Sequence, residues 1–122
     1  MAVLRLLFVD DDADIRTIVE LALGLDPTIT LRVAASAADA LQMLTAAPPD
    51  AALLDVSMPD IDGPALLAAL HDRIPDLPVI FMTARGRERD VAGLRELGAR
   101  GVIVKPFDPM SLAAQIRTLL SG

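Results

Sequence analysis

The chain has 122 residues, 53% of them hydrophobic, which is enough for one domain with a sizeable apolar core. Its net charge of −6 argues against direct binding of nucleic acid, because that binding requires many cations to neutralise phosphates. The absence of cysteine excludes disulfides and thiolate metal sites. No apolar run approaches the roughly 20 residues that cross a membrane, so we expect a cytoplasmic protein that has no membrane partner.

Short apolar runs alternate along the chain with longer segments of helical period. The predicted strands, in chain order, are residues 4–9, 29–34, 51–54, 79–82 and 101–104. The helices predicted after them cover residues 13–25, the segment after Ser36, the segment that follows the loop 59–63 and runs to about His71, residues 87–97, and the segment after Pro109. Five strand–helix units in a row predict the α/β class, with a five-stranded, doubly wound parallel sheet and helices on both faces. No repeat or linker interrupts this pattern, so residues 1–122 are predicted to form one domain.

Polar side chains follow four of the five predicted strands. Asp10 and Asp11 follow the first strand, Asp55 the third, Thr83 the fourth and Lys105 the fifth. Ligands of open parallel sheets bind beyond the carboxyl ends of the strands, so these side chains are expected to meet at one edge. Lys105 is the only lysine among eleven basic residues, and chance explains this about as well as a need for a compact ammonium group.

Three carboxylates at close range must either shift their pKa values or share a cation. With no cysteine and a single histidine, the available ligands are hard oxygens, which suit Mg²⁺, or Mn²⁺ in its place, better than zinc or copper. A magnesium ion of this kind accepts phosphate oxygens, and an aspartate can act as a nucleophile on phosphorus. Lys105 and Thr83 would then offer an ammonium and a hydroxyl group to the phosphoryl oxygens. The residues therefore indicate phosphoryl chemistry.

Four segments of the sequence resemble the landmarks of bacterial response-regulator receiver domains, in the same order and at the expected spacing. They are LLFVDDDADIR, LLDVSMPDIDG, VIFMTARG and GVIVKPFDP, and the resemblance covers essentially the whole chain. Membership of that family implies a flavodoxin-like sheet of order 2-1-3-4-5. It also implies a signalling module of a two-component system. Such a module takes a phosphoryl group from a histidine kinase, a phosphotransfer protein or a small acyl phosphate, and then switches the binding of a downstream partner.

Matched residue by residue, the resemblance implies that Asp55 is the phosphoacceptor. Asp10 and Asp11 match the acidic pair that binds Mg²⁺, directly or through water. Ser57, two residues after the nucleophile, matches the residue that offers its backbone carbonyl to the metal. The resemblance therefore implies a metal site built from Asp10, Asp11, Asp55 and the Ser57 carbonyl.

The same matching assigns the remaining site residues and shows one departure from the family pattern. Thr83 matches the switch hydroxyl that contacts the phosphoryl group, and Lys105 matches the lysine that pairs with it. The Lys105-Pro106 bond is expected to be cis. Three residues before the lysine, the family usually has Tyr or Phe, whose ring moves inward on phosphorylation, and here the residue is Val102. Phosphorylation is expected to survive this change, but Val102 is too small to report it by the usual route.

Several other residues have ordinary structural interpretations. Asp12 is expected to cap the first helix rather than ligate a metal. Asp60 and Asp62 are expected to form turns, and His71 is expected to be solvated or to cap a helix end. The methionines expected to pack in the core or at its rim are Met43, Met58, Met82 and Met110.

A group of arginines stands out on this acidic chain, in and around the fourth predicted helix. Its members are Arg85, Arg87, Arg89, Arg95 and Arg100. A solvated helix face is the simplest interpretation. The alternative is that an acidic downstream protein docks on these arginines.

The sequence bears on several other interpretations. The chain is either a stand-alone module or a receiver cut from a larger regulator or hybrid kinase. A metal-dependent aspartyl phosphohydrolase generally has a second acid two residues after its nucleophile, where this chain has Ser57, so we expect no turnover enzyme. Neither G-x-x-x-x-G-K-[ST] nor G-x-G-x-x-G occurs, which argues against nucleotide binding.

Overall fold

The structure is a computed structural model that describes residues 3–45, 47–58, 61–84 and 86–121. One parallel sheet is built from β1 (Leu4–Val9), β2 (Ile29–Ala34), β3 (Ala51–Asp55), β4 (Val79–Thr83) and β5 (Gly101–Val104). The strands lie in the order β2-β1-β3-β4-β5, which confirms the predicted sheet and its order. Two of the strands end one residue later than predicted, so Asp55 and Thr83 are the last residues of β3 and β4.

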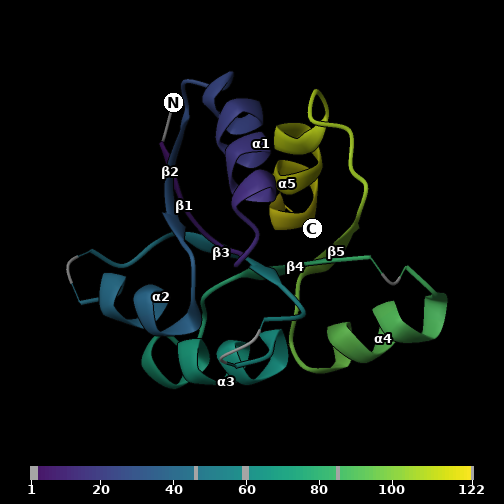
Figure 1. The fold of residues 1–122 in the computed structure, drawn as a ribbon. Coiled ribbons are helices and arrows are strands. Elements are labelled where there is room, and N and C mark those ends of the chain that lie inside the picture. Colours follow the sequence, from purple (N-terminus) through teal and green to yellow (C-terminus); the bar gives the residue numbers. More distant parts are fainter. Residues whose placement is uncertain (1–2, 46, 59–60, 85, 122) are drawn as a thin grey trace.

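Five helices cover the two faces of the sheet. They are α1 (Ala13–Gly24), α2 (Ala37–Met43), α3 (Gly63–Arg73), α4 (Glu88–Glu96) and α5 (Leu112–Ser121). Figure 1 shows α1 and α5 side by side on one face, and α2, α3 and α4 on the other. The alternation of faces is the doubly wound arrangement that the sequence predicts. Within the described ranges, no helix has the length and apolar character needed to cross a membrane.

The apolar core lies in two layers because alternate residues of each strand point to opposite faces of the sheet. Leu54 and Phe81 pack toward α2, α3 and α4, whereas Leu53 and Met82 pack toward α1 and α5. All residues of β3 and β4 are buried, as expected for central strands that are covered on both faces. Asp55 and Thr83 therefore end rigid, buried strands.

Local hydrogen bonds fix where three of the helices begin. The Asp12 side chain accepts from the backbone N–H groups of Asp14 and Ile15, which confirms that Asp12 caps α1. Ser36 caps α2 as predicted, through the backbone N–H of Asp39. Asp62 is more than a turn residue, because its carboxylate accepts from Ala65 and caps α3. The predicted turn role of Asp60 falls outside the described residues.

Three further expectations can be compared with the structure. The prediction for Met110 was wrong: its side chain is 79% exposed instead of packing against the core. His71 lies in the last turn of α3, and its Nε2 is 2.9 Å from the Leu77 carbonyl oxygen beyond the helix end. The Lys105-Pro106 bond is cis, as expected. Gly98 ends α4 with φ +108°, a conformation that favours glycine.

Candidate functional site

The carboxyl ends of four strands bring the predicted polar residues together at one edge of the sheet. Asp10 and Asp11 follow β1, Asp55 and Thr83 end β3 and β4, and Lys105 follows β5. Among the described residues, the buried polar side chains are those of Asp10, Asp55 and Thr83. Buried polar groups are costly unless they have partners, so this concentration at a single edge marks the candidate site.

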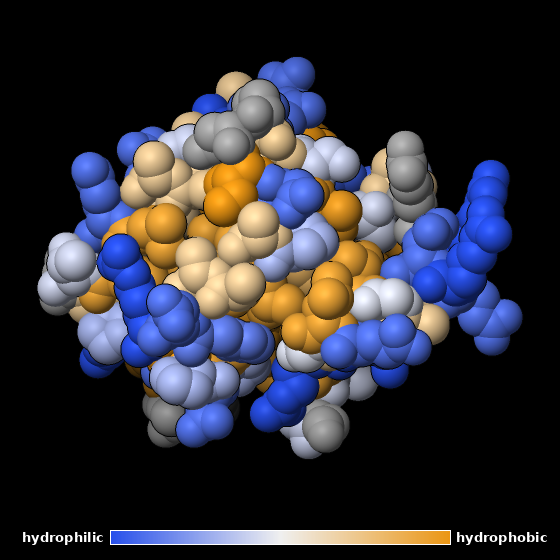
Figure 2. Space-filling model, turned by 90° about the horizontal axis from the view of Figure 1, so that it is seen from below, coloured by the Kyte–Doolittle hydropathy of each residue, from blue (hydrophilic) through white to orange (hydrophobic). Residues whose placement is uncertain are grey.

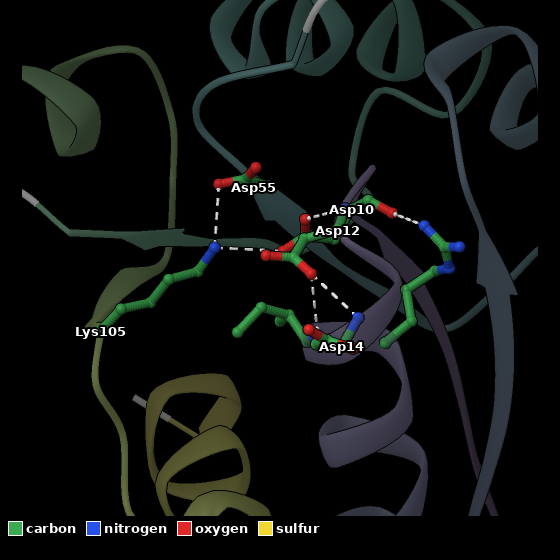
Figure 3. Close-up of polar contacts among 7 residues, drawn as sticks. Asp10, Asp12, Asp14, Asp55 and Lys105 are labelled. Carbon is green, nitrogen blue, oxygen red and sulfur yellow. Dashed lines mark hydrogen bonds and ion pairs between the residues drawn. The ribbon is translucent and has the colours of Figure 1, made fainter.

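The Lys105 ammonium group bridges two carboxylates (Figure 3). Its Nζ atom is 3.1 Å from Asp10 Oδ2 and 3.3 Å from Asp55 Oδ1. The other oxygen of the Asp10 carboxylate accepts a hydrogen bond of 2.9 Å from the backbone N–H of Asp12. Asp10 is completely buried, whereas the Asp55 side chain keeps 11% of its exposure. Asp55 is therefore the member of this pair that a reactant can reach.

Burial and the negative charge of Asp10 raise the pKa of Asp55 above its usual value, although Lys105 acts in the opposite direction. Burial alone would lower the pKa of Lys105, but the charges of Asp10 and Asp55 outweigh it and raise that pKa. The lysine is therefore held as a cation. The excess of carboxylates over cations leaves the site short of positive charge.

The acids can be tested against the geometry of a bound cation. Asp10, Asp11 and Asp55 each offer a carboxylate oxygen, and these three oxygens lie within 4.8 Å of one another. At the Mg–O distance of about 2.1 Å, opposite ligands of an octahedral ion are about 4.2 Å apart and adjacent ligands about 3.0 Å, so these side chains would move inward, or one of them would bind through water. An all-oxygen donor set with one solvent-exposed member, Asp11, fits a hard cation that keeps several waters.

A cleft of about 310 Å³ opens over Asp55. Its lining residues are Asp55, Val56, Ser57, Thr83, Ala84 and Lys105. The structure thus places Ser57 beside the phosphoacceptor candidate, and the backbone of Ser57 hydrogen-bonds to the Asp55 carboxylate. The cleft is large enough for a phosphoryl group and bordered by a hydroxyl and an ammonium group.

Backbone contacts hold the strand ends in place. The backbone N–H of Lys105 donates to the Thr83 carbonyl at 2.7 Å, which joins the ends of β4 and β5. Gly63 donates to the Val56 carbonyl at 2.8 Å and packs so closely that a Cβ there would lie 2.8 Å from the Asp55 carbonyl oxygen. The start of α3 therefore packs against the end of β3 more closely than a residue with a side chain could without a shift of its neighbours.

Two supporting residues were missed by the sequence reasoning. Gly63 lies in one of the quoted segments, but nothing in the sequence showed that a backbone would pack against it. Arg16 of α1 donates from Nη1 to the backbone carbonyl of Asp10 at 2.8 Å. An arginine on an amphipathic helix resembles an ordinary solvated residue, so the sequence carried no signal for this contact.

The predicted arginine group does not form one continuous surface. Arg87, Arg89 and Arg95 are exposed at the start of α4 and along it. Arg100 turns away and donates from Nη1 to the Leu120 carbonyl of α5 at 2.9 Å. Arg85 lies outside the described residues. Val102, at the position where the family usually has an aromatic residue, is half-buried against the core on the α2-α3-α4 side.

A doubly wound five-stranded sheet with an aspartate cluster and a lysine at its carboxyl edge is the architecture of a signalling receiver. The family model described as "Response regulator receiver domain" matches residues 6–117. The chain therefore belongs to the receiver-domain family of two-component response regulators. Phosphorylation and Mg²⁺ binding at an acidic pocket are general properties of that family, and its members receive their phosphoryl groups from histidine kinases.

Two curated relatives match almost the whole chain. The transcriptional regulatory protein PrrA of Mycobacterium tuberculosis is 40% identical over 117 residues, covering 95% of this chain and 49% of PrrA. The response regulator MprA of Mycobacterium ulcerans is 38% identical over 117 residues, covering 95% of this chain and 50% of MprA. The chain spans about half the length of these relatives.

Solved structures agree with the fold. The chemotaxis response regulator CheY4 of Vibrio cholerae is similar with a TM-score of 0.87 and 27% identity, covering 97% of this chain and 99% of CheY4. A CheY-like receiver domain protein from Methanospirillum hungatei has a TM-score of 0.85 and 28% identity, with coverage of 98% and 95%. The BeF3-activated receiver domain of DrrB has a TM-score of 0.84 and 25% identity, with coverage of 98% and 99%.

Proposed function

We propose that Asp55 accepts a phosphoryl group and that this modification switches the binding of a downstream partner. The observation that carries the proposal is the Lys105 ammonium group, which lies within 3.3 Å of both Asp10 and Asp55 beneath an open cleft. A partly buried lysine held between two carboxylates is already placed to neutralise charge that arrives on Asp55. The donor is a phosphohistidine of a kinase or phosphotransfer protein, or a small acyl phosphate.

In the proposed reaction, a carboxylate oxygen of Asp55 attacks phosphorus while the bond from phosphorus to the donor nitrogen or oxygen breaks. The leaving group keeps the electron pair, and the product is an acyl phosphate on Asp55. Lys105 pairs with the phosphoryl oxygens, and Thr83 moves its hydroxyl toward them. The backbone N–H of Lys105 donates to the carbonyl of Thr83, so the two residues are linked. Both can therefore respond to the same phosphorylation.

Asp10, Asp11, Asp55 and the backbone carbonyl of Ser57 are the proposed ligands of Mg²⁺, with Mn²⁺ as a substitute. When bound, the cation supplies positive charge to the incoming phosphoryl oxygens and relieves repulsion among the acids. The three carboxylate oxygens within 4.8 Å of one another support this assignment. The exposed Asp11 leaves a side of the cluster open to water.

The proposed protein is a signalling domain and not a turnover enzyme. Its Asp55 is phosphorylated, and the resulting acyl phosphate is slowly hydrolysed. A phosphohydrolase would be favoured by an acid two residues after Asp55, and Ser57 cannot act as one. We place the protein in the cytoplasm, where histidine kinases donate their phosphoryl groups to receiver domains. Several relatives are named as transcriptional regulators, and this chain spans about half of their length.

For the downstream partner, we propose an acidic protein surface that docks on Arg87, Arg89 and Arg95. Figure 2 shows that the face formed by α2, α3 and α4 is apolar at its centre and hydrophilic around its edges, as a docking surface with a charged rim would be. Charge reversal at Arg89 and Arg95 is expected to weaken binding of a cognate partner. Unchanged binding would remove this surface from the proposal.

Intact-mass measurement after incubation with acetyl phosphate tests the phosphorylation itself. The expected result is one phosphoryl adduct that requires Mg²⁺ and is absent in Asp55→Asn. Asp62→Asn is a matched control, because Asp62 is an exposed acid seven residues away and asparagine caps a helix as well as aspartate does. An adduct of equal yield in Asp55→Asn would contradict the assignment.

A further inference from the structure

Arg16 makes a contact that its place in the helix does not explain. It lies one turn into α1, near the positive end of the helix dipole, where a cation gains nothing. Its side chain is nevertheless half-buried and donates from Nη1 to the backbone carbonyl of Asp10 at 2.8 Å. That carbonyl belongs to the peptide group between the two consecutive acids of the candidate metal site.

The Asp10 carbonyl needs a donor because it lies just beyond the end of β1. The backbone N–H of Asp10 still donates to Ala34, the last residue of β2, at 3.2 Å. Because β2 ends at Ala34, the Asp10 carbonyl lies beyond that strand, and the Arg16 guanidinium group donates to it instead. Asp10 is thus held at its backbone N–H, at its carbonyl, and at both carboxylate oxygens by Asp12 and Lys105.

Fixing this carbonyl has a consequence for the next residue. A peptide group is planar, so the direction of the Asp10 carbonyl also sets the direction in which the chain enters Asp11. Asp11 is exposed, and its carboxylate oxygen still lies within 4.8 Å of those of Asp10 and Asp55. We infer that Arg16 is a positioning residue for the metal site, which orients the Asp10–Asp11 peptide so that both carboxylates face the same cation. This inference rests on the proposed function.

Two possible roles of Arg16 predict opposite changes in Mg²⁺ affinity when the residue is replaced. As a nearby cation, its guanidinium group repels Mg²⁺, so its removal would strengthen metal binding if charge were all that mattered. As an anchor of the Asp10 carbonyl, its removal frees the peptide and weakens metal binding. The sign of the change in Mg²⁺ affinity therefore separates the two roles.

The test is a calorimetric Mg²⁺ titration of the full chain. Urea unfolding in the presence of EDTA shows separately whether each variant is folded. Arg16→Met is expected to raise the Mg²⁺ dissociation constant about tenfold, as for other residues that orient metal ligands, and Arg16→Lys to recover part of the loss. Arg73→Met is the matched control, because Arg73 also donates from Nη1 to a backbone carbonyl, that of Leu41 at 3.2 Å, but between α3 and α2. It should leave Mg²⁺ affinity unchanged.

An unchanged or stronger affinity in folded Arg16→Met would overturn the inference. If Arg16→Met does not fold, Arg16→Lys must itself bind Mg²⁺ more weakly than the unmodified protein, and equal affinity would overturn the inference equally. Failure of the unmodified protein to bind Mg²⁺ would instead contradict the proposed metal site. The two claims therefore fail by different results.

Discussion

Replacement of Lys105 by methionine is the perturbation that the site geometry constrains most closely. The ammonium group lies 3.1 Å from Asp10 and 3.3 Å from Asp55, so it attracts both carboxylates at contact distance. At an effective dielectric constant of about 20, each attraction has a gross energy of about 5 kcal/mol. Desolvation of the three groups offsets most of this energy.

The net cost can be bounded from the burial of the pair. Removal of one partner from a buried ion pair costs about 3–5 kcal/mol, because the other charge is left without compensation. The Lys105 side chain keeps 20% of its exposure, and water therefore screens part of the interaction. We expect Lys105→Met to lower the free energy of unfolding by about 2–3 kcal/mol, and the melting temperature by about 10 °C for a domain of this length.

Mg²⁺ should reverse much of this loss. Without Lys105, the three carboxylates repel one another with no cation between them, so a divalent ion has more to neutralise than in the unmodified protein. The assay is thermal unfolding of Lys105→Met with EDTA and then with increasing Mg²⁺. Arg95→Met, which removes an exposed cation from α4, is the control. A melting temperature equal to that of the control, or an equal response of both variants to Mg²⁺, would refute the reasoning.

Two other changes test the same site. Burial and Asp10 raise the pKa of Asp55, so the folded protein holds that proton more tightly than the unfolded chain, whose carboxyl group titrates near 3.8. The ionised Asp55 therefore destabilises the fold once pH rises through the raised pKa. Asp55→Asn should withstand more urea than the unmodified protein at pH 7 without metal, and lose this advantage below pH 3.8; equal midpoints at pH 7 would count against the shift. Gly63→Ala should destabilise the fold by about 1–3 kcal/mol because its Cβ would meet the Asp55 carbonyl and the Phe81 ring. Gly24→Ala, which has open space around it, should be neutral or stabilising, and equal urea midpoints for the two variants would contradict the packing argument.

The parts of the fold that sequence predicts well depend on local patterns. Apolar runs with helical segments between them locate the strands, because central parallel strands must be apolar on both faces. Asp12 and Ser36 could be predicted as caps because capping depends on residues two or three positions away. The same logic places Asp10, Asp55, Thr83 and Lys105 at one edge, since strand ends of a parallel sheet share an edge.

The parts that sequence does not predict depend on distant contacts. Lys105 could be placed near the acids, but its bridge between Asp10 and Asp55 depends on side-chain geometry across three strands. Gly63 and Arg16 support the site through backbone atoms, which no residue pattern records. Met110 was predicted to pack because methionine usually does, yet it lies exposed in the segment before α5.

The central claim is that the phosphoryl group is carried by the side chain of Asp55. Treatment of the acetyl-phosphate-modified protein with borohydride reduces an aspartyl phosphate to homoserine with release of phosphate, and peptide mass spectrometry then locates the reduced residue. We predict homoserine at position 55, only in samples that contained Mg²⁺. Homoserine at position 10, 11 or 12, with residue 55 still aspartate, would contradict the account.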